Sequence, residues 1–181
     1  MTNKLKFKYF EGPEEDMGGL CKVPVKCALC GRNDVCFELE FVDCPELDEN
    51  QREGKVGCVE CLKEGRFGFL HGTDVGIDDF STEVLAEFRR TPEIVTWQQE
   101  VWLTHCNDFM SYQGTWGPED FYKNASSGNG RAVFMKMTDE YQNLWDDSLP
   151  EGETKLKQWH ATYYVFKCLH CGKLKGYWDC D

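Results

Sequence analysis

Three Cys-x-x-Cys pairs are the residues of this chain whose spacing is best suited to chemistry. They are Cys27 and Cys30, Cys58 and Cys61, and Cys168 and Cys171. Two thiolates three residues apart can bind one zinc ion from a tight turn, and a second pair completes the tetrahedral coordination that structural zinc prefers. The pairs therefore predict zinc binding.

The first two pairs predict one shared four-cysteine site, with residues 31–57 between them. Gly31 after the first pair and a polar, helix-like stretch after the second are typical of zinc knuckles. Two disulfides or a thioredoxin-like redox motif are the alternatives. Metal is favoured because the cysteines number eleven, an odd count, and because we expect no leader peptide and hence reduced thiols. A redox motif would also need a βαβ context.

The third pair supplies only half of a tetrahedral site, so another segment must complete it, or the pair is merely a buried turn. Cys106 is the first choice of completing ligand and His105 the second, while Cys180 could fold back through a hairpin. Adjacent side chains of a strand point to opposite faces, so His105 and Cys106 can bind together only if the backbone turns there. We expect one zinc ion, with residues available for a second.

Motifs of catalysis are missing from the sequence. It has no Gly-x-Ser-x-Gly, no glycine-rich phosphate loop with lysine, no His-Glu-x-x-His and no His-x-Glu of a zinc deaminase. Four thiolates also close a zinc site to substrate. His71 and His160 have no spaced partners, and His170 lies inside the third pair, where its ring would face solvent. We therefore predict a non-enzymatic protein without catalytic residues.

Short strands and helices are expected to position these pairs. Residues 5–10 and 35–42 alternate as half-buried strands do, and the second segment places Cys36 on the face of its glutamates. The other expected elements are a helix opening at Cys58, a capped helix over 83–90, a strand over 109–113, a helical turn over 120–123, a loop over 125–131, a capped helix over 138–145, and a strand, knuckle and strand over 159–180.

Together these elements predict an α+β fold, with small antiparallel sheets, zinc knuckles of treble-clef or zinc-ribbon type and a few short helices. Residues 1–75 would form an N-terminal zinc-finger-like region. Residues 76–181 would form a helix plus a C-terminal zinc-ribbon-like region, packed with the first as one unit. A chain of 181 residues suits one domain or two small ones, since domains commonly have about 100–150 residues.

The net charge of −12 limits the class of partner. Nucleic-acid binding draws its affinity from lysine and arginine clusters, so no nucleic-acid partner is expected. Acidic residues cluster over 14–16, 43–49, 74–83 and 139–153. Such clusters either solubilise the surface or form a docking face for a basic partner. No apolar run approaches the roughly 18 residues of a membrane span. We expect no membrane partner and a cytoplasmic protein.

Several segments in combination resemble the CbrC family of small bacterial proteins. They are residues 7–10, the paired knuckles, residues 90–92, residues 97–106 and residues 168–173. The last two are the most specific, and the match spans most of the chain. Residues 114–157 match no pattern of that family and inherit no role from it. The resemblance implies a family without an established enzymatic activity, whose namesake is linked to tolerance of a nuclease colicin.

Two hypotheses of different classes follow. In the first, zinc holds the fold while an acidic face binds a basic protein such as a nuclease toxin domain, as a tolerance or immunity factor against a colicin or a contact-dependent nuclease would. In the second, the chain is a thiol- or metal-dependent enzyme that uses Cys106 or the pair of Cys168 and Cys171. Stoichiometric zinc with every ligand thiol blocked favours the first, and a reactive thiol of low pKa favours the second.

Overall fold

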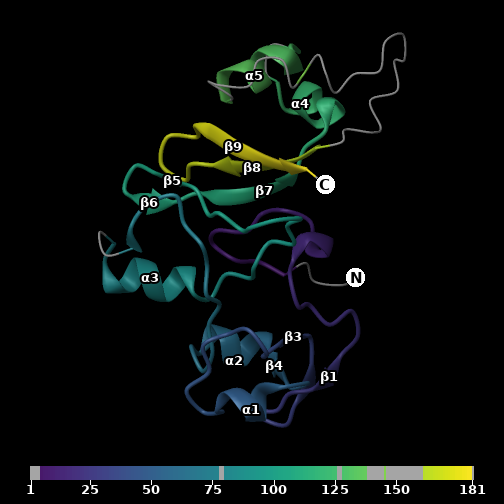
Figure 1. The fold of residues 1–181 in the computed structure, drawn as a ribbon, viewed down its shortest axis with the longest axis vertical. Coiled ribbons are helices and arrows are strands. Elements are labelled where there is room, and N and C mark those ends of the chain that lie inside the picture. Colours follow the sequence, from purple (N-terminus) through teal and green to yellow (C-terminus); the bar gives the residue numbers. More distant parts are fainter. Residues whose placement is uncertain (1–4, 78–79, 126–127, 138–144, 146–160, 181) are drawn as a thin grey trace.

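The computed structural model describes residues 5–77, 80–125, 128–137, 145 and 161–180. The elements within these ranges form three tiers along the long axis of the molecule (Figure 1). The cysteine-rich N-terminal part is the lower tier, a helix and a small hairpin lie in the middle, and a three-stranded sheet with two helices is the upper tier. The expected α+β fold with small antiparallel sheets and short helices is confirmed.

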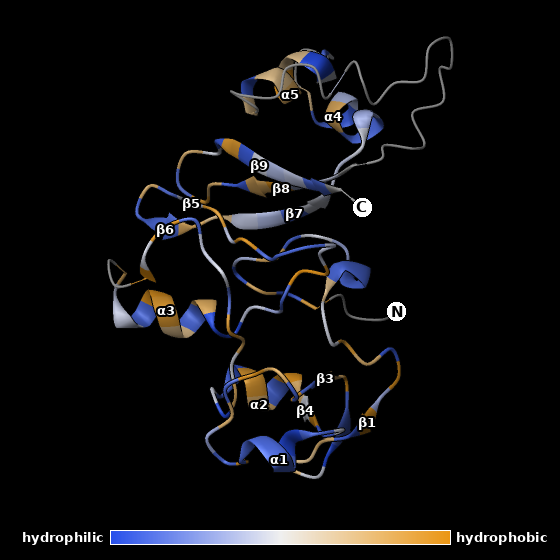
Figure 2. Ribbon diagram, viewed as in Figure 1, coloured by the Kyte–Doolittle hydropathy of each residue, from blue (hydrophilic) through white to orange (hydrophobic). Residues whose placement is uncertain are grey.

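Short antiparallel pairs and helices make up the lower tier. Its elements are β1 (Val25–Lys26), β2 (Asn33–Asp34), β3 (Cys36–Glu38), α1 (Glu49–Arg52), β4 (Val56–Cys58) and α2 (Val59–Lys63). β1 pairs with β2, and β3 pairs with β4 so that Cys36 lies opposite Cys58. Helix α2 buries Val59, Cys61 and Leu62, whereas α1 buries no side chain. Figure 2 shows the same contrast, with α2 largely apolar and α1 hydrophilic.

The middle tier contains helix α3 and a two-residue hairpin. Its elements are the 3-10 turn η1 (Glu14–Asp16), α3 (Thr82–Phe88), β5 (Thr104–His105) and β6 (Asp108–Phe109). Helix α3 begins where Ser81 Oγ accepts a hydrogen bond from the Val84 amide, a capping interaction that satisfies one free donor of the first turn. The hairpin of β5 and β6 projects toward the sheet above it (Figure 1).

The upper tier is an antiparallel sheet covered on one face by helices. Its elements are β7 (Ser111–Thr115), α4 (Pro118–Asn124), α5 (Gly130–Met137), β8 (Ala161–Lys167) and β9 (Leu174–Cys180), with β8 in the centre of the sheet. Side chains of a strand alternate between faces. Tyr164 and Phe166 accordingly join the large core cluster below the sheet, whereas Tyr163 and Val165 pack against α4 and α5 above it.

Two expected strands are shorter than predicted or missing. Residues 5–10 are not a strand, because Phe10 bridges back to Phe7 across a turn. Of residues 35–42, only Cys36–Glu38 form a strand. Cys36 does not share an open face with glutamates, since its side chain is fully buried and donates to the carbonyls of Val25 and Asp34. Phe41, which follows the end of β3, is 75% exposed.

The remaining elements agree with the sequence more closely. Helix α3, the helix opening at Cys58, the turn near residue 120 and the strand, knuckle and strand at the C-terminus are confirmed. The strand expected over 109–113 is divided between β6 and β7, and α5 begins at Gly130 inside the expected loop. The helix expected over 138–145 lies outside the described residues except for Trp145. The division at residue 75 stays a prediction.

Candidate metal centres

Two turns bring the first four cysteines together at the end of the lower tier. Cys27 and Cys30 lie in the turn between β1 and β2, which Gly31 closes with a left-handed φ of 75° while its amide donates to the Cys27 carbonyl at 2.9 Å. A left-handed residue favours glycine because it lacks a Cβ. Cys58 ends β4 and is the N-cap of α2, and Cys61 follows within that helix. We name this group the first centre.

The distances in the first centre suit one tetrahedral ion. The Sγ atoms of Cys27 and Cys61 are 3.8 Å apart, and those of Cys30 and Cys58 are 3.6 Å apart. All four sulfur atoms lie within 4.8 Å of one another. Tetrahedral zinc with Zn–S bonds of about 2.3 Å would separate its sulfurs by about 3.8 Å. The residues therefore fit a zinc ion.

Donors surround the sulfur atoms of the first centre. Arg32 Nε donates to Cys30 Sγ at 3.2 Å, and Arg66 Nη1 donates to Cys61 Sγ at 3.4 Å. Arg66 is held in place by Glu46, which accepts from both its Nε and its Nη2 at 2.7 and 2.6 Å. These guanidinium groups offset part of the negative charge that thiolates would bring, as hydrogen-bond donors around metal ligands commonly do.

The charges of the first centre also favour a cation. The hydrogen bond from Arg32 lowers the pKa of Cys30 to about 6. Burial, and then the neighbouring thiols of Cys58 and Cys30, raise the pKa of Cys61 well above its ordinary value. One thiolate therefore forms readily. It disfavours the ionisation of a second thiol, because like charges in a buried site repel one another. A divalent cation would remove this opposition.

A sharp turn builds one half of a second centre. His105 pairs with Asp108 across β5 and β6, and the two residues between them, Cys106 and Asn107, have left-handed φ values of 53° and 57°. Two consecutive left-handed residues are the signature of a type I′ hairpin turn. This turn allows the adjacent His105 and Cys106 to face the same point, which a straight strand would prevent.

The other half of the second centre is the turn between β8 and β9. The Gly172 amide donates to the Cys168 carbonyl at 3.0 Å, and the Cys168 amide donates to the Lys173 carbonyl at 2.8 Å. The same hydrogen bonds close the turn at Cys27 and Gly31, so the two knuckles have one local structure. The second centre thus comprises His105, Cys106, Cys168 and Cys171.

The distances in the second centre also suit one ion. Cys106 Sγ is 3.8 Å from Cys171 Sγ and 3.1 Å from His105 Nδ1, and Cys171 Sγ is 3.5 Å from the same nitrogen. The four ligand atoms lie within 4.8 Å of one another. With Zn–S bonds of about 2.3 Å and a Zn–N bond of about 2.0 Å, tetrahedral geometry would place nitrogen and sulfur about 3.5 Å apart. These residues fit zinc as well.

Thiol charges in the second centre resemble those in the first. Burial acts to raise the pKa of Cys168, but amide hydrogen bonds from Cys171 and His170 outweigh it and lower that pKa to about 6. Desolvation, and then the neighbouring sulfurs of Cys171 and Cys168, raise the pKa of Cys106 to about 11. Without a cation the group therefore carries one thiolate more easily than two.

A buried carboxylate ties the second centre to the core. Asp108 is 6% exposed, and its Oδ1 accepts a hydrogen bond from the Tyr9 hydroxyl at 2.7 Å. Its Oδ2 lies 2.9 Å from His170 Nε2 and 3.4 Å from Lys8 Nζ. His170 therefore does not simply face solvent, as its position in the knuckle suggested, but links the β8–β9 turn to the hairpin. Such outer contacts orient ligand-bearing segments.

Sequence reasoning selected the residues of both groups and missed the side chains around them. Arg32, Arg66 and Asp108 were not singled out, although Arg32 directly follows Cys30 and Gly31, and Asp108 lies two residues after Cys106.

Cys180 was a possible ligand; its backbone pairs with Ala161 in the sheet, and its side chain lies outside the described residues. His71 is a structural residue. Its Nδ1 lies 2.9 Å from Glu100 Oε2, and its Nε2 lies 3.1 Å from the Thr91 carbonyl oxygen.

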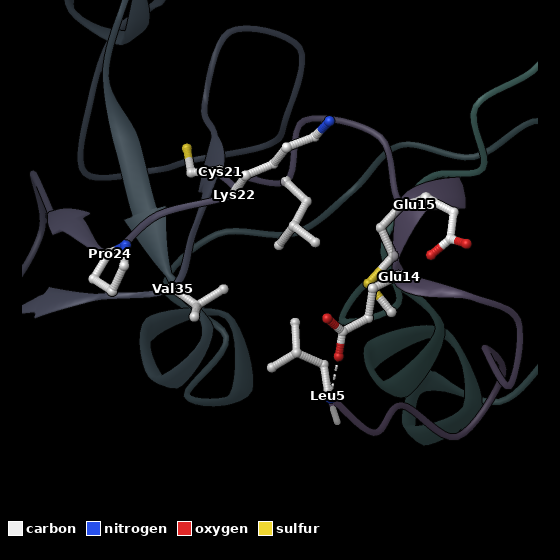
Figure 3. Close-up of a pocket in the computed structure, with 9 residues that line it drawn as sticks. Leu5, Glu14, Glu15, Cys21, Lys22, Pro24 and Val35 are labelled. Atoms are coloured by element: carbon white, nitrogen blue, oxygen red, sulfur yellow. Dashed lines mark hydrogen bonds between the residues drawn. The ribbon is translucent and has the colours of Figure 1, made fainter. Parts of the chain in front are cut away.

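A cavity of about 470 Å³ lies apart from both centres (Figure 3). Its residues are mostly apolar, with two carboxylates and one lysine among them: Leu5, Glu14, Glu15, Met17, Leu20, Cys21, Lys22, Pro24 and Val35. Glu14 Oε1 accepts a hydrogen bond from the Leu5 amide at 2.8 Å. Burial raises the pKa of the Cys21 thiol, so this sulfur is protonated near neutral pH and is a poor nucleophile.

Comparison with known proteins places the chain in a family. The sequence profile of an uncharacterised protein family, UPF0167, matches residues 5–180. The chain belongs to the UPF0167 family. The matched range includes both metal-ligand groups.

Curated UPF0167 proteins are similar to parts of the chain. A UPF0167 protein of Pseudomonas aeruginosa is 33% identical over 111 residues, which cover 60% of this chain and 55% of that protein. UPF0167 proteins of Mycobacterium bovis and Mycobacterium tuberculosis are each 31% identical over 105 residues, covering 56% of this chain and 51% of theirs. The chain thus matches about half the length of these relatives. No solved structure matches it.

In the part of the chain that the structure describes, no helix is both long enough and apolar enough to cross a bilayer.

Proposed function

We propose that this UPF0167 protein is a non-enzymatic protein that holds two zinc ions and uses the fold that they stabilise to bind another protein. The observation that carries the proposal is the presence of two four-ligand groups, each compact enough for one tetrahedral ion. Thiolate and imidazole ligands select zinc over magnesium or calcium, which prefer oxygen. Each group supplies four protein ligands, which is the arrangement of structural rather than catalytic zinc.

The two ions would have distinct structural roles. When bound, zinc supplies a cross-link and offsets thiolate charge. At the first centre, Cys27 and Cys30 would join the β1–β2 turn to Cys58 and Cys61 at the start of α2. At the second centre, the same kind of cross-link would join the β5–β6 hairpin to the β8–β9 turn. Both cross-links connect segments that are distant in the sequence. A cross-link that closes a long loop removes more conformational entropy from the unfolded chain than one that closes a short loop.

A thiol enzyme acting through Cys106 or the pair of Cys168 and Cys171 has less support. An attacking thiol must be present as thiolate near neutral pH. The pKa of Cys106 is raised to about 11 by desolvation and neighbouring sulfurs, which leaves that thiol protonated when no metal is bound. Cys168, whose pKa is lowered to about 6, has an exposed fraction of only 1% and is shielded from a substrate.

The proposed partner is a basic protein. A net charge of −12 favours encounter with cationic surfaces and disfavours nucleic acid. The resemblance to the CbrC family adds a setting, in which the partner is a nuclease toxin domain and the role is tolerance or immunity. A cytoplasmic location would keep the ligand thiols reduced. These finer statements rest on charge and resemblance.

Several acidic residues already have structural roles and are unsuited to testing this idea. Glu46 holds Arg66 beside Cys61, Asp48 caps α1, and Asp43 lies 3.3 Å from Arg89. Asp74 is 3.3 Å from Lys175. Reversing these charges would disturb the fold as well as the surface. Glu40 and Glu53 are better probes, because both are exposed and lie near each other, just beyond the paired ends of β3 and β4.

Replacing Glu40 and Glu53 together with lysine should slow association with a basic colicin nuclease domain by about tenfold at low ionic strength, the lower end of electrostatic steering effects. The difference should shrink as salt is added, because the Debye length falls to about 8 Å at physiological ionic strength. Stopped-flow association rates would measure it, with host tolerance of the toxin as a second readout.

Glu119→Lys is the matched control, since Glu119 is an exposed residue of α4 at the opposite end of the molecule (Figure 1). It adds positive charge without changing the surface around Glu40 and Glu53. Unchanged association and tolerance in the double variant, with zinc content and melting temperature preserved, would contradict an acidic docking face there.

A further inference from the structure

The two centres differ in the access of solvent to their sulfur atoms. In the first centre, Cys27, Cys58 and Cys61 are at most 1% exposed. Its fourth cysteine, Cys30, is half-buried and accepts a hydrogen bond from Arg32. In the second centre only Cys168 is buried, while Cys106 and Cys171 are both exposed. A dissolved reagent can therefore reach two sulfurs of the second centre far more easily than those of the first.

The exposed sulfurs of the second centre lie beside each other on the tips of two turns. Cys106 Sγ and Cys171 Sγ are 3.8 Å apart. A disulfide bond is about 2.05 Å long, so the two atoms need to approach by about 1.8 Å. Cys106 is in the hairpin turn between β5 and β6, and Cys171 is in the turn between β8 and β9, so neither belongs to a strand.

We propose that Cys106 and Cys171 are an oxidation site, which a two-electron oxidant of the peroxide class converts to a disulfide while the first centre stays reduced. The inference deepens the proposed function, because it makes the second centre the one whose metal is lost on oxidation. A disulfide would remove two of the four ligands and leave only His105 and Cys168. Two ligands are too few for a structural zinc site.

The reaction with hydrogen peroxide balances without any further reagent. One of the two sulfurs, which is a thiolate while it serves as a metal ligand, attacks a peroxide oxygen, so that a sulfur–oxygen bond forms, the oxygen–oxygen bond breaks and hydroxide leaves. The second thiolate attacks the resulting sulfenic acid at sulfur, so that the disulfide forms and a second hydroxide leaves. Each hydroxide takes one proton from the acid form of the buffer. Two thiolates, one peroxide and two protons thus give one disulfide and two water molecules, with peroxide reduced by two electrons.

The test uses the full-length, reduced protein treated with hydrogen peroxide at neutral pH. Remaining thiols are alkylated, the protein is digested, and disulfides are mapped by mass spectrometry while a chromogenic chelator records released zinc. We expect a disulfide between Cys106 and Cys171, release of about one zinc per chain, and full alkylation of the first-centre cysteines. Oxidation of the first centre at the same rate, or a map without this disulfide, would overturn the inference.

Variants separate this inference from the proposed function. Cys106→Ser and Cys171→Ser should each abolish the peroxide-induced disulfide, and Cys21→Ser should leave it intact because that residue belongs to neither centre. Metal content measured before peroxide is added tests the second zinc on its own. A chain that holds only one zinc contradicts the proposed second metal centre, and the disulfide map in that same protein still decides whether the two exposed thiols react together.

Discussion

Replacing Cys61 with serine is expected to abolish metal binding at the first centre and to unfold the lower tier of the protein. Cys61 is fully buried in α2, and its sulfur faces the other three cysteines of that centre. Structural zinc contributes an apparent binding free energy of about 10–16 kcal/mol in zinc-finger peptides. Whole domains are stable by only about 5–15 kcal/mol. Loss of this ion therefore removes most of the stability of the surrounding fold.

The Cys61→Ser protein should be insoluble, or should show loss of helical and strand signal in far-ultraviolet circular dichroism together with an early urea transition. Cys21→Ser is the matched control, since Cys21 lies in the same part of the chain but outside the ligand group. A Cys61→Ser protein that binds as much metal as the wild type and unfolds at the same urea concentration would show that the first centre is not a structural zinc site.

Replacing Cys106 with serine is expected to lower the metal content from about two ions to about one per chain, since structural zinc takes four ligands. The remaining ion should be the one in the first centre, which shares no ligand with the second. Because Cys106 is exposed at the tip of a hairpin, the variant should stay folded, in contrast to Cys61→Ser. Elemental analysis of the purified, reduced protein measures the change.

Asn107→Gly provides the control for Cys106→Ser. Residue 107 has a left-handed φ of 57°, which glycine adopts readily, so the turn should persist and both ions should be retained. Cys180→Ser tests the competing ligand. If it removes one ion while Cys106→Ser removes none, the assignment of Cys106 is wrong and the second centre is completed from β9.

The ligand groups could be predicted from sequence because a metal ion requires a short spacing between paired ligands, and this spacing is the same in unrelated folds. The two cysteines of each pair need only one turn, and a glycine after Cys30 and after Cys171 supplies the left-handed residue that closes it. Pairing the third knuckle with His105 and Cys106 was harder. It depends on a turn built from Cys106 and Asn107, and of these only asparagine is a residue that commonly favours left-handed backbone.

Other features depend on tertiary packing and were not accessible from local patterns. Residues 5–10 alternate like a strand, but Phe10 and Tyr9 are both buried because the segment turns and is covered on both sides. Cys36 alternates with its apolar neighbours, yet it is buried because β4 pairs against it and Val25 lies over its sulfur. The roles of Arg66 and Asp108 arise from contacts between segments far apart in the sequence, which spacing alone does not reveal.

The central claim is that both four-ligand groups hold zinc, and the metal content of the purified wild-type protein tests it most directly. The protein should be prepared under reducing conditions without added metal, then measured by inductively coupled plasma mass spectrometry against its amino-acid concentration, with native mass spectrometry to count ions per chain. Two zinc ions per chain are predicted. A reduced, folded protein that contains one zinc ion per chain, or none, would contradict this claim.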